Sequence, residues 1–199
     1  MEPLLKGIIS GITISLMIGP IFLALADITI TKGWKSGLAY IAGILLSDLL
    51  LIYFVETVFL RLELELYKTP IALTGGVVLI VFGLVTFFSK VELKSKDVSS
   101  VKTLSAAVLK GFTINIFNPF VSVWWVTMYS TISINYLVIN DKFLFYGGIL
   151  LMVFLFDLIK MKFAYYLKQQ LATQSLNKLK KIVGVCLILF GAAMLIRFI

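Results

Sequence analysis

Long apolar stretches separated by short polar segments make up most of this 199-residue chain. Six of them can be marked, at about Leu4–Ile30, Leu38–Leu60, Ile71–Ser89, Ala106–Ser133, Phe143–Met161 and Ile182–Phe198. A helix of about 20 apolar residues crosses the hydrocarbon core of a bilayer, and each stretch is close to that length or longer. The pattern therefore predicts an all-α integral membrane protein with six transmembrane helices.

The first and fourth stretches share a motif that ends in proline. The segment from Gly11 to Pro20 reads GITISLMIGP, and the segment from Gly111 to Pro119 reads GFTINIFNP. Glycine, threonine and isoleucine match at a separation of 100 residues, and the prolines match at 99. Because proline lacks an amide N–H and its ring displaces the preceding turn, we expect helices 1 and 4 to be broken at these prolines.

Two further matches follow in the same order along the chain. The Gly43-Ile-Leu-Leu segment of the second stretch recurs in the fifth at Gly148, and segments 76–83 and 184–191 agree at six of eight positions. A unit of three crossings that is repeated once must insert in the opposite orientation the second time. The sequence thus predicts one transmembrane domain (1–199) with a 3+3 inverted repeat. Repeat one is 1–89, a cytoplasmic loop is 90–105, and repeat two is 106–199.

The basic charge of +8 adds an orientation to this picture. With six crossings, 13 of the 18 Lys and Arg residues fall on one side of the membrane and 5 on the other. The positive-inside rule assigns the richer side to the cytoplasm, so both termini are expected outside. Topology accounts for the charge without nucleic acid as a partner. The hydrophobic share of 60% and the mean hydropathy of +1.05 leave little of the chain for a soluble domain.

Polar residues within the apolar stretches are the candidates for function. Asp48 lies near the middle of the second stretch, where a charged aspartate costs about 2.5–3.5 kcal/mol. Such residues are retained for a pathway, a proton relay or a buried pairing. Asn115 and Asn118 share a helix face, and they could line a cavity or hydrogen-bond between helices. Asp157 precedes Lys160 by three residues, so an ion pair is the alternative to a functional role.

Broken helices in inverted-repeat transporters supply polar groups to a site at mid-membrane. The amide groups that follow each proline, at the positive end of a helix dipole, suit a carboxylate. The carbonyls of Leu16 and Asn115, freed by the prolines, would suit an ammonium group together with Asp48. The sequence predicts a site for a zwitterion such as an amino acid, with more hydrogen bonding from the second motif. The substrate-binding candidates are Ser15, Gly19, Pro20, Asn115, Asn118 and Pro119. Asp48 and Asp157 are the candidates for proton coupling.

Other classes of function have less support. The chain has no histidine and one cysteine, Cys186, which we expect to pack within the last helix. Soft-metal ligands are therefore scarce, and a dithiol relay is impossible. We find no motif for an enzyme and predict no cofactor. A divalent metal-ion exporter and a non-transporting assembly protein remain alternatives. Small residues spaced by four, such as Gly7 and Gly11, could pack inside the chain or in a homodimer.

Several of these motifs resemble the LysE family of amino-acid exporters, including the RhtB-type proteins. The resemblance covers nearly the whole chain. It rests on Gly19-Pro20, Lys32-Gly33-Trp34, Asp48, the segment from Lys110 to Pro119, and the segment from Leu179 to Gly191. It implies export of amino acids or related metabolites across the plasma membrane, driven by the proton motive force. The chain departs from the usual family pattern at Ser47, often glycine, and at Phe120, often lysine.

Overall fold

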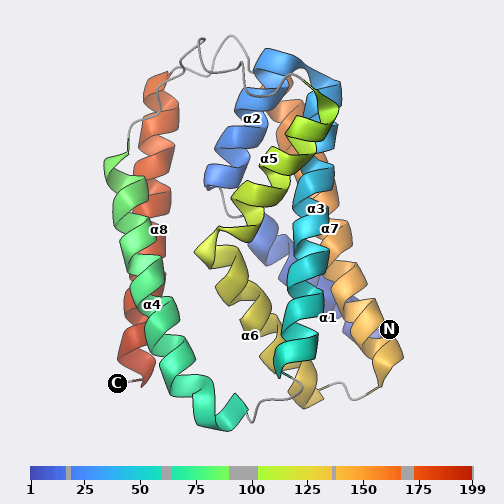
Figure 1. The fold of residues 1–199 in the computed structure, drawn as a ribbon, viewed down its shortest axis with the longest axis vertical. Helices are drawn as coiled ribbons and strands as arrows, with labels where there is room; N and C mark the ends of the chain where they lie inside the picture. The colour runs from blue at the N-terminus through green and yellow to red at the C-terminus, as the bar shows by residue number, and fades with distance from the viewer. Residues whose placement is uncertain (17–18, 60–63, 90–102, 136–137, 167–172, 199) are drawn as a thin grey trace.

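The computed structural model describes residues 1–16, 19–59, 64–89, 103–135, 138–166 and 173–198, and all elements in these ranges are α-helices (Figure 1). The helices are α1 (Glu2–Ser15), α2 (Pro20–Lys32), α3 (Trp34–Phe59), α4 (Leu64–Phe88), α5 (Leu104–Ile116), α6 (Pro119–Asn135), α7 (Ile139–Tyr166) and α8 (Thr173–Phe198). The all-helical architecture predicted from the apolar pattern is confirmed for these residues.

Both prolines of the repeated motif stand at breaks between helices. Pro20 is the first residue of α2 and Pro119 the first residue of α6, a position where the missing N–H costs no hydrogen bond. The axes of α1 and α2 differ by 74°, and those of α5 and α6 by 65°. The two breaks lie near the middle of the long axis of the bundle (Figure 1). The interruptions expected from the sequence are therefore present.

The lengths of the helices bear on the number of membrane crossings. Within the described residues, α3 and α7 are long and apolar enough to cross a bilayer, and each bent pair would add one crossing if it acts as a single span. In α4 and α8 the apolar parts are shorter, at Leu73–Phe88 and Lys181–Ile196. The structure thus has two to four crossings by these criteria, and the six-span topology stays a prediction.

Several helices extend beyond the apolar stretches marked in the sequence. The α4 helix begins at Leu64, seven residues before the apolar stretch, and it includes Pro70. The α8 helix begins at Thr173, nine residues before the apolar stretch marked from Ile182. A helix needs no apolar residues where it leaves the bilayer, so the apolar stretches underestimated the lengths of α4 and α8. Of the predicted loop 90–105, residues 90–102 lie outside the described residues, and α5 already begins at Leu104.

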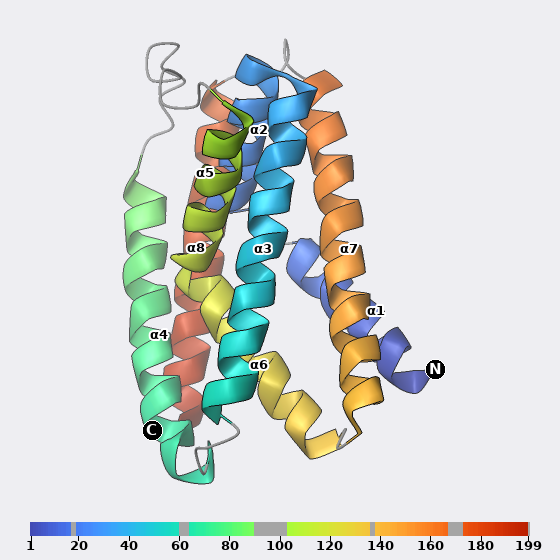
Figure 2. The same ribbon diagram turned by 45° about the vertical axis from the view of Figure 1, so that its right-hand side comes forward.

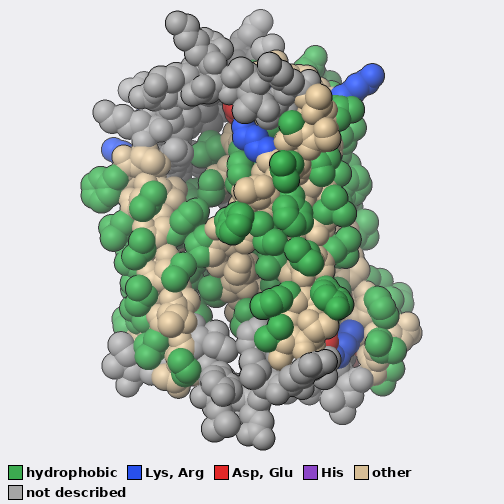
Figure 3. Space-filling view, viewed as in Figure 1, with side chains coloured by type: hydrophobic (Ala, Val, Ile, Leu, Met, Phe, Trp, Pro, Cys, Tyr) green, Lys and Arg blue, Asp and Glu red, His purple; other side chains and the backbone are tan. Residues whose placement is uncertain are grey.

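The described helices carry apolar side chains on their outer faces and polar side chains within the bundle. Hydrophobic residues cover the middle of the face shown in Figure 3. Those on the outside include Leu46, Leu50 and Phe54 of α3, Leu151, Leu155 and Ile159 of α7, Val77, Val81 and Val85 of α4, and Leu189 of α8. The buried polar residues include Ser15, Ser47, Asp48, Asn115, Asn118 and Asp157. This arrangement is typical of a protein whose outer surface contacts lipid.

Glycines allow close contact between paired helices, beginning with α1 and α7 and with α3 and α5. Gly7 of α1 lies against the carbonyl group of Phe145 in α7, whereas Gly43 of α3 lies against that of Val108 in α5. Gly111 of α5 in turn lies against the carbonyl group of Tyr40. The predicted stripes of small residues therefore pack within the chain. Cys186, in contrast, is exposed, so its predicted packing role is wrong.

Helix directions show how these pairs are related. Figures 1 and 2 show that α1 and α7 run side by side in one direction, while α3 and α5 run side by side in the other. The α4 and α8 helices are antiparallel, with Gly76 against Gly191 and Gly83 against Gly184. Every helix of the first half therefore runs opposite to the matching helix of the second half.

Two adjacent glycines of α7 provide a matched test of this packing. A Cβ atom at Gly148 would lie 2.8 Å from the carbonyl oxygen of Leu4 and 3.0 Å from the amide nitrogen of Ile8, whereas one at Gly147 would meet no atom within 4 Å. We expect Gly148→Ala to destabilise the protein by about 1–3 kcal/mol, because two backbones must separate. Gly147→Ala should be neutral or stabilising by about 0.5–1 kcal/mol. Thermal unfolding in detergent, followed by size exclusion, measures both. Equal midpoints for the two variants would contradict the packing.

Candidate functional site

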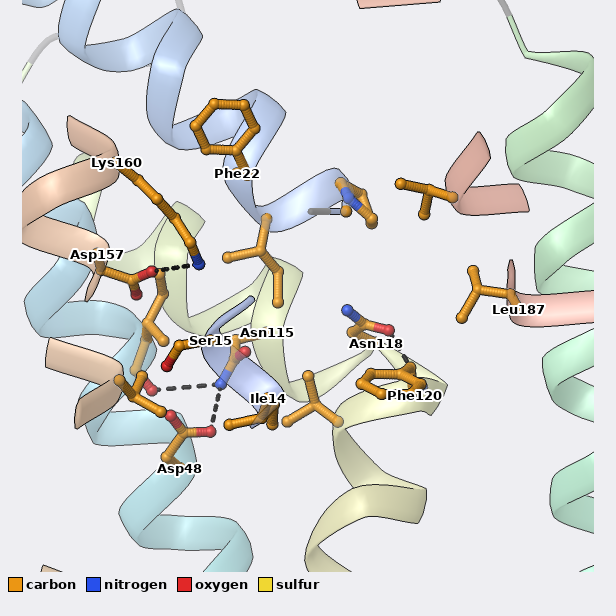
Figure 4. Close-up of a pocket in the computed structure, with 17 residues that line it drawn as sticks. Ile14, Ser15, Phe22, Asp48, Asn115, Asn118, Phe120, Asp157, Lys160 and Leu187 are labelled. Carbon is orange, nitrogen blue, oxygen red and sulfur yellow. Dashed lines mark hydrogen bonds and ion pairs between the residues drawn. The ribbon is translucent and has the colours of Figure 1, made fainter. Parts of the chain in front are cut away.

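A cavity of about 80 Å³ lies where the two helix breaks meet the centre of the bundle (Figure 4). Its polar lining consists of Ser15, Asp48, Asn115, Asn118, Asp157 and Lys160, and its apolar lining includes Ile14, Phe22, Val121, Val153 and Leu187. The backbone at Gly19 and Pro20 also contributes. Seven of the described helices and both helix breaks thus reach one small space, which could hold a few waters or a small polar ligand.

Asp48 is held by donors from two other helices. The side-chain nitrogen Nδ2 of Asn115 donates to Oδ1 of Asp48 at 2.8 Å, and Nε1 of Trp125 donates to the same oxygen at 3.0 Å. The carboxylate is 3% exposed. Hydrogen bonds to an ionised group are stronger than bonds between neutral groups, and they offset part of the cost of burial. Asp48 therefore joins α3, α5 and α6 at the cavity wall.

Asn115 has two further partners on α3. Its Nδ2 also donates to the carbonyl oxygen of Ile44 at 3.3 Å and to the hydroxyl of Ser47. Ser47 in turn donates to the carbonyl of Ile44 at 2.9 Å. The sequence left open whether Asn115 lines a cavity or hydrogen-bonds between helices, and in the structure it does both. Ser47, one of the departures from the usual family pattern, adds an acceptor to this contact.

Sequence reasoning missed Trp125 as a partner of Asp48. Its side chain is fully buried, and its ring centroid lies 6.0 Å from that of Tyr146. A signal was present in the sequence. Val121, Trp125, Met128 and Ile132 recur at helical spacing and are all buried. This periodicity would have directed Trp125 toward the interior, although nothing in it indicates a carboxylate partner.

Asn118 acts as the cap of α6. Its Oδ1 accepts a hydrogen bond from the amide of Phe120 at 3.1 Å, and its own amide donates to the carbonyl of Asn115 at 3.1 Å. The sequence had suggested that the carbonyl of Asn115 is free, but it accepts the hydrogen bond from the amide of Asn118. The first amide N–H of α6, that of Phe120, is likewise already bonded to the side chain of Asn118. The reason is local: an asparagine before proline caps the helix with its own side chain. Figure 4 shows the nitrogen of Asn118 directed away from Phe120.

The start of α2 differs from that of α6. Gly19 is its N-cap residue, in an extended conformation, and as a glycine it has no side chain to cap the first turn. Gly19, Pro20, Ile21 and Phe22 all line the cavity. The uncapped amides and the positive end of the helix dipole thus adjoin the cavity at this break. Residues 17–18, which follow Leu16, lie outside the described part of the chain, so the state of the Leu16 carbonyl stays a prediction.

Asp157 forms the ion pair considered as the alternative to a functional role. Its Oδ1 lies 3.0 Å from Nζ of Lys160, and the two side chains are 5% and 18% exposed. Both residues line the cavity, and Figure 4 shows the lysine nitrogen directed inward. Sequence reasoning treated Lys160 only as a partner of Asp157. The structure also makes it the cation of the cavity wall.

The other candidates divide as follows. Ser15 is 4% exposed, lines the cavity, and its hydroxyl has no hydrogen-bond partner among the described residues. Pro119 begins α6 but is not part of the cavity lining. Asp27 of α2, which is not one of these candidates, lies outside the cavity lining, 3.9 Å from Lys110, and both side chains are about one-third exposed. Seven of the eight residues predicted from the sequence therefore meet at one cavity.

A second polar cluster joins α3 to α7 beyond the cavity. Glu56 accepts hydrogen bonds from Nζ of Lys142 and from the hydroxyl of Tyr146, each at 2.8 Å. In the described residues, no group of three or more His, Cys, Asp or Glu side chains is placed to hold a metal ion.

Comparison with known proteins identifies the family. The family model described as LysE type translocator matches residues 12–197, which is nearly the whole chain. No curated protein and no solved structure matches the chain. The match includes both helix breaks and every residue of the cavity lining. The chain therefore belongs to the LysE type translocator family and is a membrane transporter of small molecules.

Proposed function

We propose that this translocator is a secondary transporter that exports amino acids or related small metabolites across the plasma membrane in exchange for protons. One observation carries the proposal: polar groups of both broken helices and two buried aspartates meet in one cavity inside a bundle with an apolar surface. Polar and acidic groups placed in this way mark substrate and proton pathways in membrane proteins.

The arrangement of the helices supports transport by alternating access. Matching helices of the two halves run in opposite directions, and both breaks lie midway along the bundle (Figure 1). Inverted repeats of this kind bind substrate at the interface of the repeats, and rocking of one repeat against the other exposes the site to each side in turn. We infer that the chain is such a 3+3 repeat with six crossings.

The chemistry of the cavity suits a zwitterion. Asp48 provides a carboxylate for an ammonium group, while the uncapped start of α2 and Lys160 provide positive potential for a carboxylate. These groups come from different walls of the same cavity (Figure 4). An amino acid has its ammonium group and its carboxylate bonded to the same carbon atom. This matches a small cavity with a negative group on one wall and positive potential on another.

The two acids are unequal candidates for proton coupling. Asp157 has a cationic partner in Lys160, whereas the partners shown for Asp48 are the neutral donors Asn115 and Trp125. A buried carboxylate without a cation gains most from taking up a proton. We therefore assign proton binding to Asp48 first, with Asp157 as the second candidate.

Flux measurements in proteoliposomes test the proposal. We expect efflux of one or more radiolabelled amino acids to accelerate when a pH gradient is imposed, and Asp48→Asn to abolish that acceleration because the side chain no longer takes up a proton. Asp27→Asn is the matched control, since Asp27 is a partly exposed acid outside the cavity lining. It should leave the response to the gradient unchanged. Gradient-driven efflux that persists in Asp48→Asn would overturn the assignment, and absence of amino-acid flux in the unaltered protein would overturn the substrate class.

A charge-pair cycle separates a structural role of Asp157 from a role in coupling. Removing only the cation, as in Lys160→Ala, leaves a buried carboxylate unpaired and should cost about 3–5 kcal/mol of stability. The double variant Asp157→Asn with Lys160→Gln removes both charges, and we expect it to regain most of that stability. It should keep the response to the pH gradient at saturating substrate, although loss of Lys160 should raise the substrate concentration that is needed. Thermal midpoints and the same flux assay provide the readouts. A stable double variant that no longer responds to the gradient would assign coupling to Asp157.

A further inference from the structure

The ionisable groups of the cavity wall can be balanced by one additional positive charge, and this limits how substrate and proton can bind together. We propose that Asp48 and Ser15 form a single cation subsite, which holds either a proton or the primary ammonium group of the substrate but not both. Exchange is then coupled by direct competition at one carboxylate. The inference rests on the proposed function, since it specifies how the same site would exchange an amine for a proton.

Counting the charges of the cavity wall leads to this subsite. Its ionisable residues are Asp48, Asp157 and Lys160. Lys160 and Asp157 neutralise each other at 3.0 Å. No lysine or arginine of the described residues forms an ion pair with Asp48. An ionised Asp48 thus leaves the wall with one negative charge, which a single monovalent cation balances.

Hydrogen bonding directs that cation to one part of the wall. Both described donors to Asp48 bind the same oxygen, Oδ1, and neither is charged. The hydroxyl of Ser15 lines the same cavity and is buried without a partner among the described residues. A buried hydroxyl without a partner is costly, and an ammonium group is the donor that would satisfy it. The carboxylate and the hydroxyl therefore suit a primary ammonium group.

Charged groups on the helices packed against Asp48 leave this balance intact. From α7 it faces Asp157, which Lys160 neutralises. On α2 and α5, Asp27 and Lys110 lie near each other and outside the cavity lining. On α6 the neighbouring group is the neutral indole of Trp125.

Charged groups also lie near the C-terminal end of α3 and the N-terminal end of α7. Glu56, Lys142 and Tyr146 bind one another there, outside the cavity lining, and Lys142 also lies over the ring of Tyr129. Asp48 is thus the one acid of the cavity wall, within the described residues, that lacks a cationic partner.

Competition makes a quantitative prediction about binding. An ammonium ion binds only the ionised carboxylate, so its presence favours loss of the proton. The pH midpoint of Asp48 should therefore fall by about one pH unit for each tenfold rise in ammonium concentration above its dissociation constant. Two independent sites would instead produce a midpoint that does not depend on ammonium concentration.

The indole of Trp125 provides a reporter for this experiment. Its N–H donates to Oδ1 of Asp48, so protonation of the carboxylate should shift the indole ¹H–¹⁵N resonance. The chain has three tryptophans, and loss of one signal in Trp125→Phe assigns the resonance. The probe is propylammonium chloride, an amine that, like the lysine side chain, stays charged below about pH 9. Titrations of pH at several probe concentrations, with 1-propanol as the uncharged control, measure the midpoint in detergent.

The expected result is a midpoint that falls with propylammonium and does not respond to 1-propanol. Ser15→Ala should weaken the effect of propylammonium while the midpoint without probe stays the same. The double variant Asp157→Asn with Lys160→Gln should keep the competition, because propylammonium has no carboxylate for Lys160 to attract and the titrating group is Asp48. A midpoint independent of propylammonium at all concentrations, or competition that persists in Asp48→Asn, would overturn the inference. Because the probe is a simple amine, competition without amino-acid flux would refute only the proposed substrate class, and flux without competition only this subsite.

Discussion

A carboxylate buried among apolar helices must find hydrogen-bond donors, and the centre of this protein is arranged around that requirement. Asp48 receives one donor from α5 and another from α6, so a single side chain determines how three helices meet. Without these donors, ionisation in a low-dielectric interior would be prohibitive. With only neutral donors, the charge is stabilised but not cancelled. In the exchange that we propose, this uncancelled charge lets Asp48 respond to a cation that enters the cavity.

The polar centre depends in turn on glycine packing one helical turn away. Gly43 and Gly111 bring the backbones of α3 and α5 together, each against a carbonyl group of the other helix. Ser47 and Asn115 follow these glycines by four residues, on the same helix faces. The close approach lets one amide nitrogen of Asn115 reach three acceptors on α3. A side chain in place of either glycine would separate the backbones and remove these hydrogen bonds, so packing and site geometry cannot vary independently.

Sequence periodicity and the repeated proline motif predicted the helical class, the two breaks and seven residues of the cavity. These features depend on local rules, since proline interrupts a helix wherever it occurs and apolar runs mark helices. The contributions of Trp125 and Lys160 depend on tertiary contacts, which a single sequence does not contain. The cap formed by Asn118 was missed for another reason. Its side chain accepts from the amide of Phe120, which the sequence analysis had assigned to the substrate. An asparagine before proline is compatible with either partner for that amide, so the sequence did not decide between them.

The difference between the two breaks bears on what the cavity can recognise. When the motifs are matched at their prolines, Gly19 corresponds to Asn118. Asn118 occupies the first amide of α6 with its own side chain, while Gly19 leaves the start of α2 uncapped beside the cavity. A pair of identical breaks would present the same chemistry twice, which suits a ligand with two equal ends. In this chain one break exposes helix amides and the other places Asn115 against an acid. That inequality suits a ligand with one anionic and one cationic end, held in a single orientation.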